Sequence, residues 1–315
     1  MSEADRADRP ASPASPDASD APDAPPSPPA PDRAVCPICP QACRLRAGQL
    51  GNCGARVGAR VAAGSEVRPA AFGRITALAL DPIEKKPLAR FWPGSQILSV
   101  GGIGCNLHCP FCQNAEISQC RASAGLVAGL RYLPPEDLVA EAVRLGPRGN
   151  IGVAYTYNEP FIAYEYLQQS ARLVHAAGLL NVVVSNGYIN AGPLRQLLPL
   201  IDAANIDLKA FRQSAYDQMG APHGLERVQQ SIELLAAHCH LEVTTLIVPG
   251  LNDDAGQITE IAAWLASINK DIPLHITRFH PAYKMLKTPA PARPQIFGYV
   301  RLAERHLNYV YAGNI

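Results

Sequence analysis

The stretch Ile97-Leu98-Ser99-Val100-Gly101-Gly102-Ile103-Gly104-Cys105-Asn106-Leu107-His108-Cys109-Pro110-Phe111-Cys112 determines the fold of this 315-residue chain. It opens with an apolar, strand-like run, and three cysteines follow at x3 and x2 spacing. A 4Fe–4S cluster has four irons, and each normally takes one thiolate. Three thiolates from one loop would therefore leave one iron open to a substrate or cofactor. Phe111 would place an aromatic face beside whatever binds that iron.

Two other sites are compatible with these cysteines. Tetrahedral zinc needs four ligands, and His108 would be an awkward fourth because it adjoins Cys109 in the same loop. Cys120, eight residues after Cys112, could close the cluster and make it a plain electron carrier. A leftover cysteine, however, is more often a small buried hydrophobic residue. The spacing therefore favours a cluster with an open iron on Cys105, Cys109 and Cys112.

Six further motifs occur along the chain in a fixed order. They are Asp81-Pro82-Ile83-Glu84-Lys85-Lys86-Pro87, Cys112-Gln113-Asn114, Tyr155-Thr156-Tyr157-Asn158-Glu159-Pro160, Ser185-Asn186-Gly187-Tyr188, Asp207-Leu208-Lys209 and Arg278-Phe279-His280-Pro281. With the cysteine loop, this combination resembles the radical S-adenosylmethionine (SAM) enzyme of the AmmeMemoRadiSam system. That group is a branch similar to pyruvate formate-lyase activating enzymes. The resemblance covers about residues 36–315.

Composition narrows the class of protein. The formal net charge is +1, so no polybasic surface is indicated and nothing argues for a nucleic-acid partner. The cysteines gather at 36–53 and 105–120, which indicates metal ligation in a reducing compartment and not disulfides. No apolar run approaches the roughly 18–20 residues that span a bilayer, and the N-terminus has no hydrophobic signal region. We therefore expect a cytoplasmic protein with no membrane partner.

The chain divides into three segments by composition. Residues 1–35 are rich in Pro, Ala, Ser and Asp, and we expect a disordered tail because they offer little apolar surface to bury. Residues 36–63 carry a Cys-rich metal-binding segment with Cys-x2-Cys-x3-Cys-x9-Cys spacing, formed by Cys36, Cys39, Cys43 and Cys53. Zinc and a second, fully ligated iron–sulfur cluster are both compatible with four thiolates, and thiolate chemistry alone leans toward zinc. Residues 64–315 form the core domain.

Within the core, short β-branched runs alternate with longer helical stretches. Strands are predicted at 97–101, 151–155, 180–185, 203–208, 241–248 and 273–278, and a final strand at 308–313. Helices are predicted near 135–145, 160–177, 191–199, 223–239 and 254–268. This alternation indicates an α/β fold with parallel βαβ units, although a closed eight-stranded barrel or a doubly wound sheet would also produce it. The resemblance implies the incomplete (β/α)6 TIM-like barrel of radical SAM proteins.

In such barrels the chemistry lies at the carboxyl ends of the strands, where the motifs fall. The resemblance implies that Glu159, beside Asn158, accepts hydrogen bonds from the amino group of SAM. Lys209 would pair with the SAM carboxylate. Because strand side chains alternate, Asp207 and Lys209 point to one face, so a simple structural ion pair is the alternative.

The nucleoside and the remaining pocket residues follow from the same resemblance. Ser185 and Asn186 offer hydroxyl and amide groups suited to a nucleoside, although Asn-Gly is also a common turn. His280 matches a histidine that lies at the SAM pocket of the activating enzymes. An isolated histidine is more often a structural residue.

The implied activity is reductive cleavage of SAM at the 4Fe–4S cluster, which yields a 5′-deoxyadenosyl radical that abstracts hydrogen from a substrate. The low potential of such a cluster implies a flavodoxin- or ferredoxin-type reductant. Two more specific roles remain open: activation of a glycyl radical enzyme, and chemistry on a small molecule or on a Memo-like protein. A non-catalytic two-cluster electron carrier is the alternative from another class.

Overall fold

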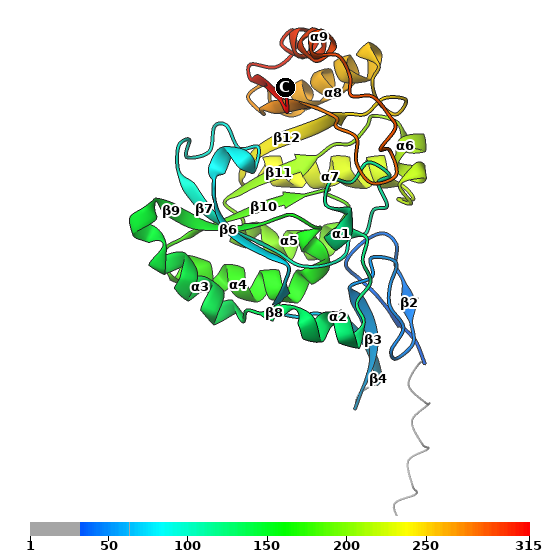
Figure 1. The fold of residues 1–315 in the computed structure, drawn as a ribbon, viewed down its shortest axis with the longest axis vertical. Coiled ribbons are helices and arrows are strands. Elements are labelled where there is room, and N and C mark those ends of the chain that lie inside the picture. Colours follow the sequence, from blue (N-terminus) through cyan, green and yellow to red (C-terminus); the bar gives the residue numbers. More distant parts are fainter. Residues whose placement is uncertain (1–31, 63) are drawn as a thin grey trace, which may run out of the picture. The chain divides into compact units, whose positions relative to one another are not determined.

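An eight-stranded, mostly parallel sheet forms the centre of the computed structural model, which describes residues 32–62 and 64–315 (Figure 1). The strands are β6 Ala77–Pro82, β7 Gln96–Gly101, β9 Asn150–Tyr155, β10 Leu180–Ser185, β11 Ala203–Asp207, β12 His240–Ile247, β13 Leu274–Arg278 and β14 Val310–Gly313. They lie in this order, so strands that are neighbours in sequence are neighbours in space. β6 runs antiparallel to β7, and every other pair is parallel.

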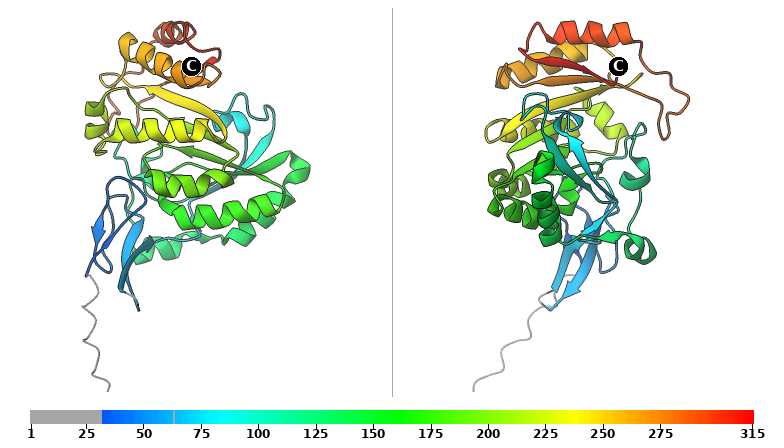
Figure 2. Two further views of the ribbon diagram at one scale, coloured as in Figure 1. Left: turned by 180° about the vertical axis from the view of Figure 1, so that it is seen from behind. Right: turned by 60° about the vertical axis from the view of Figure 1, so that its left-hand side comes forward.

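Helices connect the parallel strands and cover one face of the sheet. They are α3 Pro135–Arg144, α4 Tyr164–Ala176, α5 Ala191–Leu197, α7 Gly224–Ala236, α8 Ala255–Ile268 and α9 Arg293–Ala303. Seen from behind, α4, α5 and α7 lie in front of the sheet (Figure 2). In the described part of the chain β6 and β14 are the two sheet edges and do not pair with each other. The predicted incomplete α/β barrel is therefore confirmed.

All six predicted core strands are present as β7 and β9 to β13, and the predicted C-terminal strand is β14. The antiparallel strand β6 and the helix α9 were not predicted as elements. The side chains of β6 are mostly half-buried, so its sequence lacks the continuous apolar run of the central strands. A proline-rich segment precedes α9, so the sequence pattern does not indicate where this helix begins. No helix among the described residues is long and apolar enough to cross a membrane.

The Cys-rich segment belongs to the same compact unit as the barrel. It contains two antiparallel pairs, β1 Ala34–Val35 with β2 Arg44–Leu45 and β3 Arg56–Val61 with β4 Gly64–Pro69. Most of the predicted tail, residues 1–31, lies outside the described residues, whereas Ala34–Val35 are paired in a strand. The predicted boundary at 63–64 falls inside the β3–β4 hairpin.

The described chain also contains a third two-stranded pair and three short helices. β5 Arg74–Ile75 pairs with β8 Arg131–Tyr132. The helices α1 Ala115–Ser118 and α2 Ala124–Gly129 follow the cysteine loop, and α6 Gln213–Gln218 precedes α7. None of these pieces enters the eight-stranded sheet.

The segment between β6 and β7 closes the barrel at the amino ends of its strands. It begins with the short helix η1 Ile83–Lys85. Ile83 and Leu88 are fully buried and pack with Ile97 of β7 and Val182 of β10. The Pro87 carbonyl accepts a hydrogen bond from a β11 asparagine at 2.8 Å. Ala154 of β9 belongs to the same apolar cluster, so packing and this bond together hold the segment against four strands.

Glu242 of β12 holds the segment between β6 and β7 in place through hydrogen bonds to its backbone. Its carboxylate is fully buried and accepts hydrogen bonds from the backbone amides of Ala89 (2.9 Å) and Arg90 (2.8 Å). The Nε2 atoms of His240 and His275 lie 2.9 and 2.6 Å from it. Burial alone would raise the pKa of Glu242, but these four partners lower it to about 2. The carboxylate is therefore stabilised in its ionised form.

We expect Glu242→Gln to lower the free energy of unfolding at pH 7 by about 3 kcal/mol, because a neutral amide cannot satisfy four partners. The folded-state pKa lies below the ordinary value, so this contribution is present above about pH 4.5 and is lost as pH falls toward about 2. Urea denaturation across this pH range measures both effects. Glu141→Gln, in an exposed ion pair with Arg144, is the control and should change stability by less than about 1 kcal/mol. Equal stability of Glu242→Gln and the unaltered protein would contradict the assignment.

Candidate functional site

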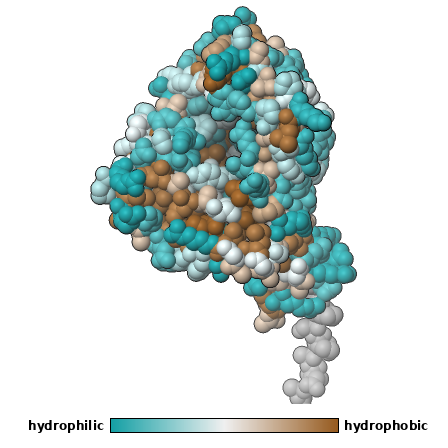
Figure 3. All heavy atoms as spheres, in the orientation of Figure 1, coloured by the Kyte–Doolittle hydropathy of each residue, from teal (hydrophilic) through white to brown (hydrophobic). Residues whose placement is uncertain are grey.

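A cavity of about 330 Å³ lies at the carboxyl ends of the barrel strands. Ten of the eleven predicted cluster and SAM residues line it: Cys105, Cys109, Phe111, Cys112, Asn158, Glu159, Ser185, Asn186, Asp207 and Lys209. They come from the loop after β7 and from the ends of β9, β10 and β11. An all-atom view of the face shown in Figure 1 is hollowed near its centre, with hydrophilic residues along much of the rim (Figure 3). The parallel sheet thus gathers motifs that are far apart in sequence.

The three thiols of the cysteine loop face this cavity from an apolar setting. Cys109 is buried, and Cys105 and Cys112 are half-buried. The Sγ of Cys109 lies 3.3 Å from the Met219 sulfur, and the Sγ of Cys112 lies 3.0 Å from the Ser118 hydroxyl. Burial raises the pKa of Cys109 to about 11 and that of Cys105 well above its usual value. These thiols therefore stay neutral until a metal displaces their protons.

The arrangement of thiols suits a cluster better than a single ion. Within residues 32–62 and 64–315, no three His, Cys, Asp or Glu side chains lie close enough together to hold one metal ion. In a 4Fe–4S cluster each thiolate binds a different iron, so the ligands stand further apart. Three sulfur donors around one cavity fit that donor set.

The two residues considered as a fourth ligand lie elsewhere. Cys120 does not line the cavity, and its thiol donates to the Ile117 carbonyl at 3.0 Å. The ring nitrogens of His108 lie 3.0 Å from Gln119 Oε1 and 3.2 Å from Asn52 Oδ1. Both side chains are engaged with protein partners, which leaves three thiols at the cavity.

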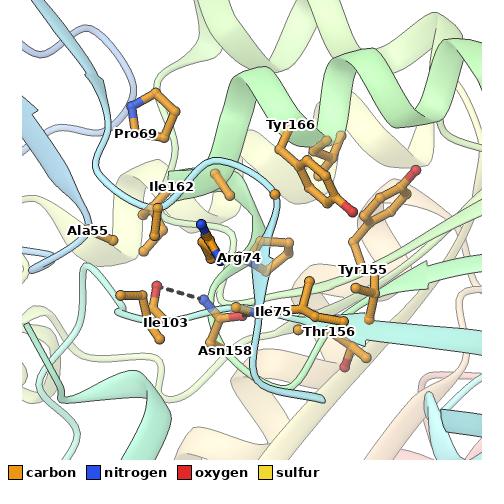
Figure 4. Close-up of a pocket in the computed structure, with 18 residues that line it drawn as sticks. Ala55, Pro69, Arg74, Ile75, Ile103, Tyr155, Thr156, Asn158, Ile162 and Tyr166 are labelled. Atoms are coloured by element: carbon orange, nitrogen blue, oxygen red, sulfur yellow. Dashed lines mark hydrogen bonds between the residues drawn. The ribbon is translucent and has the colours of Figure 1, made fainter. Parts of the chain in front are cut away.

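Asn158 holds the cysteine loop in place. Its Oδ1 accepts from the Gly102 amide at 2.8 Å, and its Nδ2 donates to the carbonyls of Ile103 (3.1 Å) and Gly104 (3.0 Å). The bond to Ile103 is visible in Figure 4, beside a small apolar pocket of about 50 Å³ behind the loop. The amide is thus committed to the backbone of the loop, which favours a positioning role for Asn158.

Glu159 is the buried acidic centre of the cavity. Its carboxylate accepts from the Ser185 hydroxyl (2.8 Å) and from the amides of Asn186 (2.9 Å) and Phe161 (3.0 Å). Burial raises its pKa to about 7, although these three donors oppose the shift. Ser185 and Asn186 therefore orient the carboxylate in addition to lining the cavity.

Lys209 and Asp207 form an ion pair on the cavity wall. The Lys209 Nζ lies 3.0 Å from Asp207 Oδ2, and both side chains face the cavity as strand alternation predicts. Burial opposes the charge of Lys209, but Asp207 and the nearby Cys109 and Cys105 raise its pKa above the usual value. The Lys209 carbonyl accepts from Asn252 at 2.7 Å, which fixes its backbone. The ammonium is therefore charged and stationary.

The cavity is also lined by a tyrosine and two lysines that were not assigned to SAM binding. Tyr157, Lys85 and Lys86 line the cavity, and the Tyr157 hydroxyl donates to Asp81 at 2.7 Å. The Asp81 carboxylate also pairs with the Nζ atoms of Lys86 at 2.9 Å and of Lys85 at 3.4 Å. The Lys86 Nζ lies 4.7 Å from the centre of the Tyr157 ring. Tyr157 has φ +71°, a strained value for a residue with a Cβ. The Asp81–Pro87 motif thus reaches the cavity through Lys85 and Lys86. Both lysines form ion pairs with the single carboxylate of Asp81.

His280 is the predicted pocket residue that the structure does not bring to the cavity. It is exposed, and its Nε2 lies 3.2 Å from the Asn314 carbonyl. Phe279 takes the inward position and is fully buried. Because neighbouring side chains in extended chain point to opposite sides, His280 faces outward.

Solved structures share this fold. SuiB of Streptococcus suis, bound to the precursor peptide SuiA, matches with a TM-score of 0.51 and 15% identity over 68% of this chain and 47% of SuiB. A domain of pyruvate-formate lyase-activating enzyme from Bacteroides vulgatus matches with a TM-score of 0.46 and 18% identity, over 52% of this chain and 99% of the domain. At these identities the likeness concerns the fold alone.

Sequence relatives define the family. The uncharacterised protein MJ0808 of Methanocaldococcus jannaschii is 35% identical over 282 residues, which cover 88% of this chain and 80% of that protein. The family model described as the radical SAM superfamily matches residues 100–264, just over half of the chain, and this span contains the cysteine loop and most of the cavity. The chain belongs to the radical SAM superfamily.

Proposed function

We propose that this protein reductively cleaves SAM at a 4Fe–4S cluster held by Cys105, Cys109 and Cys112. The observation that carries the proposal is that three thiols of one loop share a cavity with the buried carboxylate of Glu159 and the half-buried ammonium of Lys209. Membership of the superfamily supports the same chemistry. When bound, the cluster would supply one electron to the sulfonium of SAM, giving methionine and a 5′-deoxyadenosyl radical that abstracts hydrogen from a substrate.

The two charged groups match the two charged ends of the SAM amino-acid moiety. Glu159 retains free lone pairs beside the bonds from Ser185, Asn186 and Phe161, so it can accept from an amino group. Lys209 can donate to a carboxylate while Asp207 keeps it charged. Both groups are held by fixed partners, which reduces the reorganisation that binding requires.

Other cavity residues surround the nucleoside and the substrate. Thr277 and Thr244 line the cavity and offer hydroxyl oxygens that can accept from ribose, although the Thr244 hydroxyl itself donates to Asn205 at 2.9 Å, and Phe111 supplies an aromatic wall. The end lined by Lys85 and Lys86 carries more positive than negative charge, since Asp81 is shared. We assign that end to the substrate and to exclusion of water from the reacting atoms.

Two classes of substrate are compatible with the proposed chemistry: a small molecule and a protein. Activation of a glycyl radical enzyme and modification of a Memo-like protein are the two protein-directed roles that the sequence resemblance supports. A glycyl radical enzyme encoded beside this chain would favour the first. A flavodoxin- or ferredoxin-type protein is proposed as the reductant, because the cluster must be reduced at low potential.

A non-catalytic electron carrier would need a fourth thiolate at the cluster, and Cys120 is the candidate. We expect Cys120→Ala to retain the iron content of the unaltered protein and its SAM-induced change in the EPR spectrum, because this thiol is bonded to Ile117 away from the cavity. Cys109→Ala is the matched comparison and should lose the cluster. Iron analysis and EPR after anaerobic reconstitution measure both properties. Loss of the cluster in Cys120→Ala would favour the electron carrier.

The affinity for SAM should depend on pH through Glu159. Burial raises the pKa of this carboxyl to about 7, and only the ionised form accepts the amino group of SAM. Affinity should therefore fall as pH is lowered through about 7, approaching tenfold per unit on the acid side. Titration of reconstituted protein with SAM between pH 6 and 8 measures it, with cluster absorbance checked at each pH.

Glu159→Gln provides the control for this pH effect. It keeps the size of the side chain but removes the titrating group, so SAM should bind more weakly and with no pH dependence near 7. Lys287→Met, an exposed lysine outside the cavity, should behave as the unaltered protein does. A flat pH profile in the unaltered protein would show that Glu159 does not contact the amino group.

A further inference from the structure

The four N-terminal thiols surround a single enclosed pocket. Cys36, Cys39, Cys43 and Cys53 all line it, and three of them are less than 9% exposed. Burial, with smaller contributions from the neighbouring thiols of Cys36 and Cys53, raises the pKa of Cys39 to about 12. Four sulfur donors thus converge on one buried space, which is the arrangement of a metal centre and not of scattered free thiols.

The spacing of these thiols distinguishes between the two metal centres that the sequence left open. Four thiolates on one zinc ion, each at about 2.3 Å, close on the ion and leave no room between them. Here the pocket keeps about 10 Å³ of free space, and no three of its thiols lie close enough to share an ion within the described residues. The thiols of the SAM-site loop, Cys105, Cys109 and Cys112, likewise form no such single-ion group among the described residues. The geometry matches donors that bind separate irons.

Arg56 provides a second, independent sign of an anionic group in this pocket. It lines the pocket at 2% exposure, and its terminal nitrogens are held by Glu165 and by the carbonyls of Ile162 and Val67. Its Nε has no hydrogen-bond partner among the described residues, although it is fully buried. Burial opposes the charge of Arg56, whereas Glu165 and Cys36 raise its pKa. A sulfur-rich anionic group beside Cys36 would satisfy the free N–H.

The pocket also adjoins the SAM-site cysteines. The Cys105 amide donates to the Cys53 carbonyl at 3.2 Å, so one hydrogen bond links a thiol-bearing residue of each set. Gly104 makes this approach possible: its φ is +84°, and a Cβ there would lie 2.5 Å from the Cys53 carbonyl oxygen. Asn106 of the same loop is a hydrogen-bonding neighbour of Cys39. The backbones of the two cysteine segments are therefore in direct contact.

We propose that Cys36, Cys39, Cys43 and Cys53 hold a second iron–sulfur cluster, which relays electrons to the cluster on Cys105, Cys109 and Cys112. Four protein thiolates leave this cluster no open iron, so it carries electrons and does not bind SAM. One electron passes from the flavodoxin- or ferredoxin-type reductant to the second cluster, and the same electron then reduces the SAM-site cluster. No covalent bond changes in the relay. The relay rests on the proposed SAM chemistry, whereas the second cluster does not.

The site is tested with the full chain after anaerobic reconstitution with iron and sulfide. In the Cys105→Ser/Cys109→Ser/Cys112→Ser triple variant, we expect roughly half the iron of the unaltered protein, no stoichiometric zinc, and an EPR signal that SAM does not alter. Zinc in place of iron, or a folded triple variant without iron, would overturn the second cluster. If the triple variant does not fold, the EPR spectrum of the reduced, unaltered protein tests the second cluster independently. It should show two signals on reduction, only one of which responds to SAM, and a single SAM-sensitive signal would contradict the proposal.

The relay is tested with Cys36→Ser/Cys39→Ser. This variant should keep the SAM-sensitive EPR signal when reduced by dithionite, but reduced flavodoxin should reduce its SAM-site cluster at least tenfold more slowly. Cys239→Ser removes a thiol remote from both sites and should match the unaltered protein. An unchanged rate in the double variant would overturn the relay. Failure of the proposed function is distinguishable, because the unaltered protein would then show no response to SAM.

Discussion

The side chain of Asn158 joins the end of β9 to the backbone of the cysteine loop, and the remaining site geometry depends on this clamp. Three hydrogen bonds to Gly102, Ile103 and Gly104 hold the segment just before Cys105. The same residue leads directly into Glu159, so the position of the carboxylate is tied to that of the thiols. Small errors in either position would separate the proposed cluster from the groups proposed to bind SAM.

The parallel barrel explains why the carboxylate and the thiols lie at the same place. Each strand delivers its carboxyl end to one rim, and each motif residue needs only to follow a strand to reach the cavity. The opposite rim is closed by the 83–91 segment, which Glu242 anchors through four partners. Lys85 and Lys86 belong to this closing segment and still reach the cavity. One connection thus seals the barrel and supplies its basic end.

Much of this arrangement is predictable from sequence, because strand periodicity and cysteine spacing are local properties. The six core strands, the three-thiol loop and the shared face of Asp207 and Lys209 follow from them. Hydrogen bonds over long sequence separations do not, and neither the clamp by Asn158 nor the contact of Tyr157 with Asp81 has a local signal. For His280 the sequence motif matches, but Phe279 takes the buried position and the His280 side chain is exposed to solvent. The spacing of the N-terminal thiols is likewise a three-dimensional property that cysteine counting cannot supply.

The central claim is that three thiols and no fourth protein ligand leave an iron able to act on SAM. The most direct measurement is the yield of 5′-deoxyadenosine when the anaerobically reconstituted protein is reduced in the presence of SAM. The account predicts 5′-deoxyadenosine and methionine in equal amounts, and neither without reductant. Intact SAM after reduction, in a protein that demonstrably contains the reduced cluster, would contradict it.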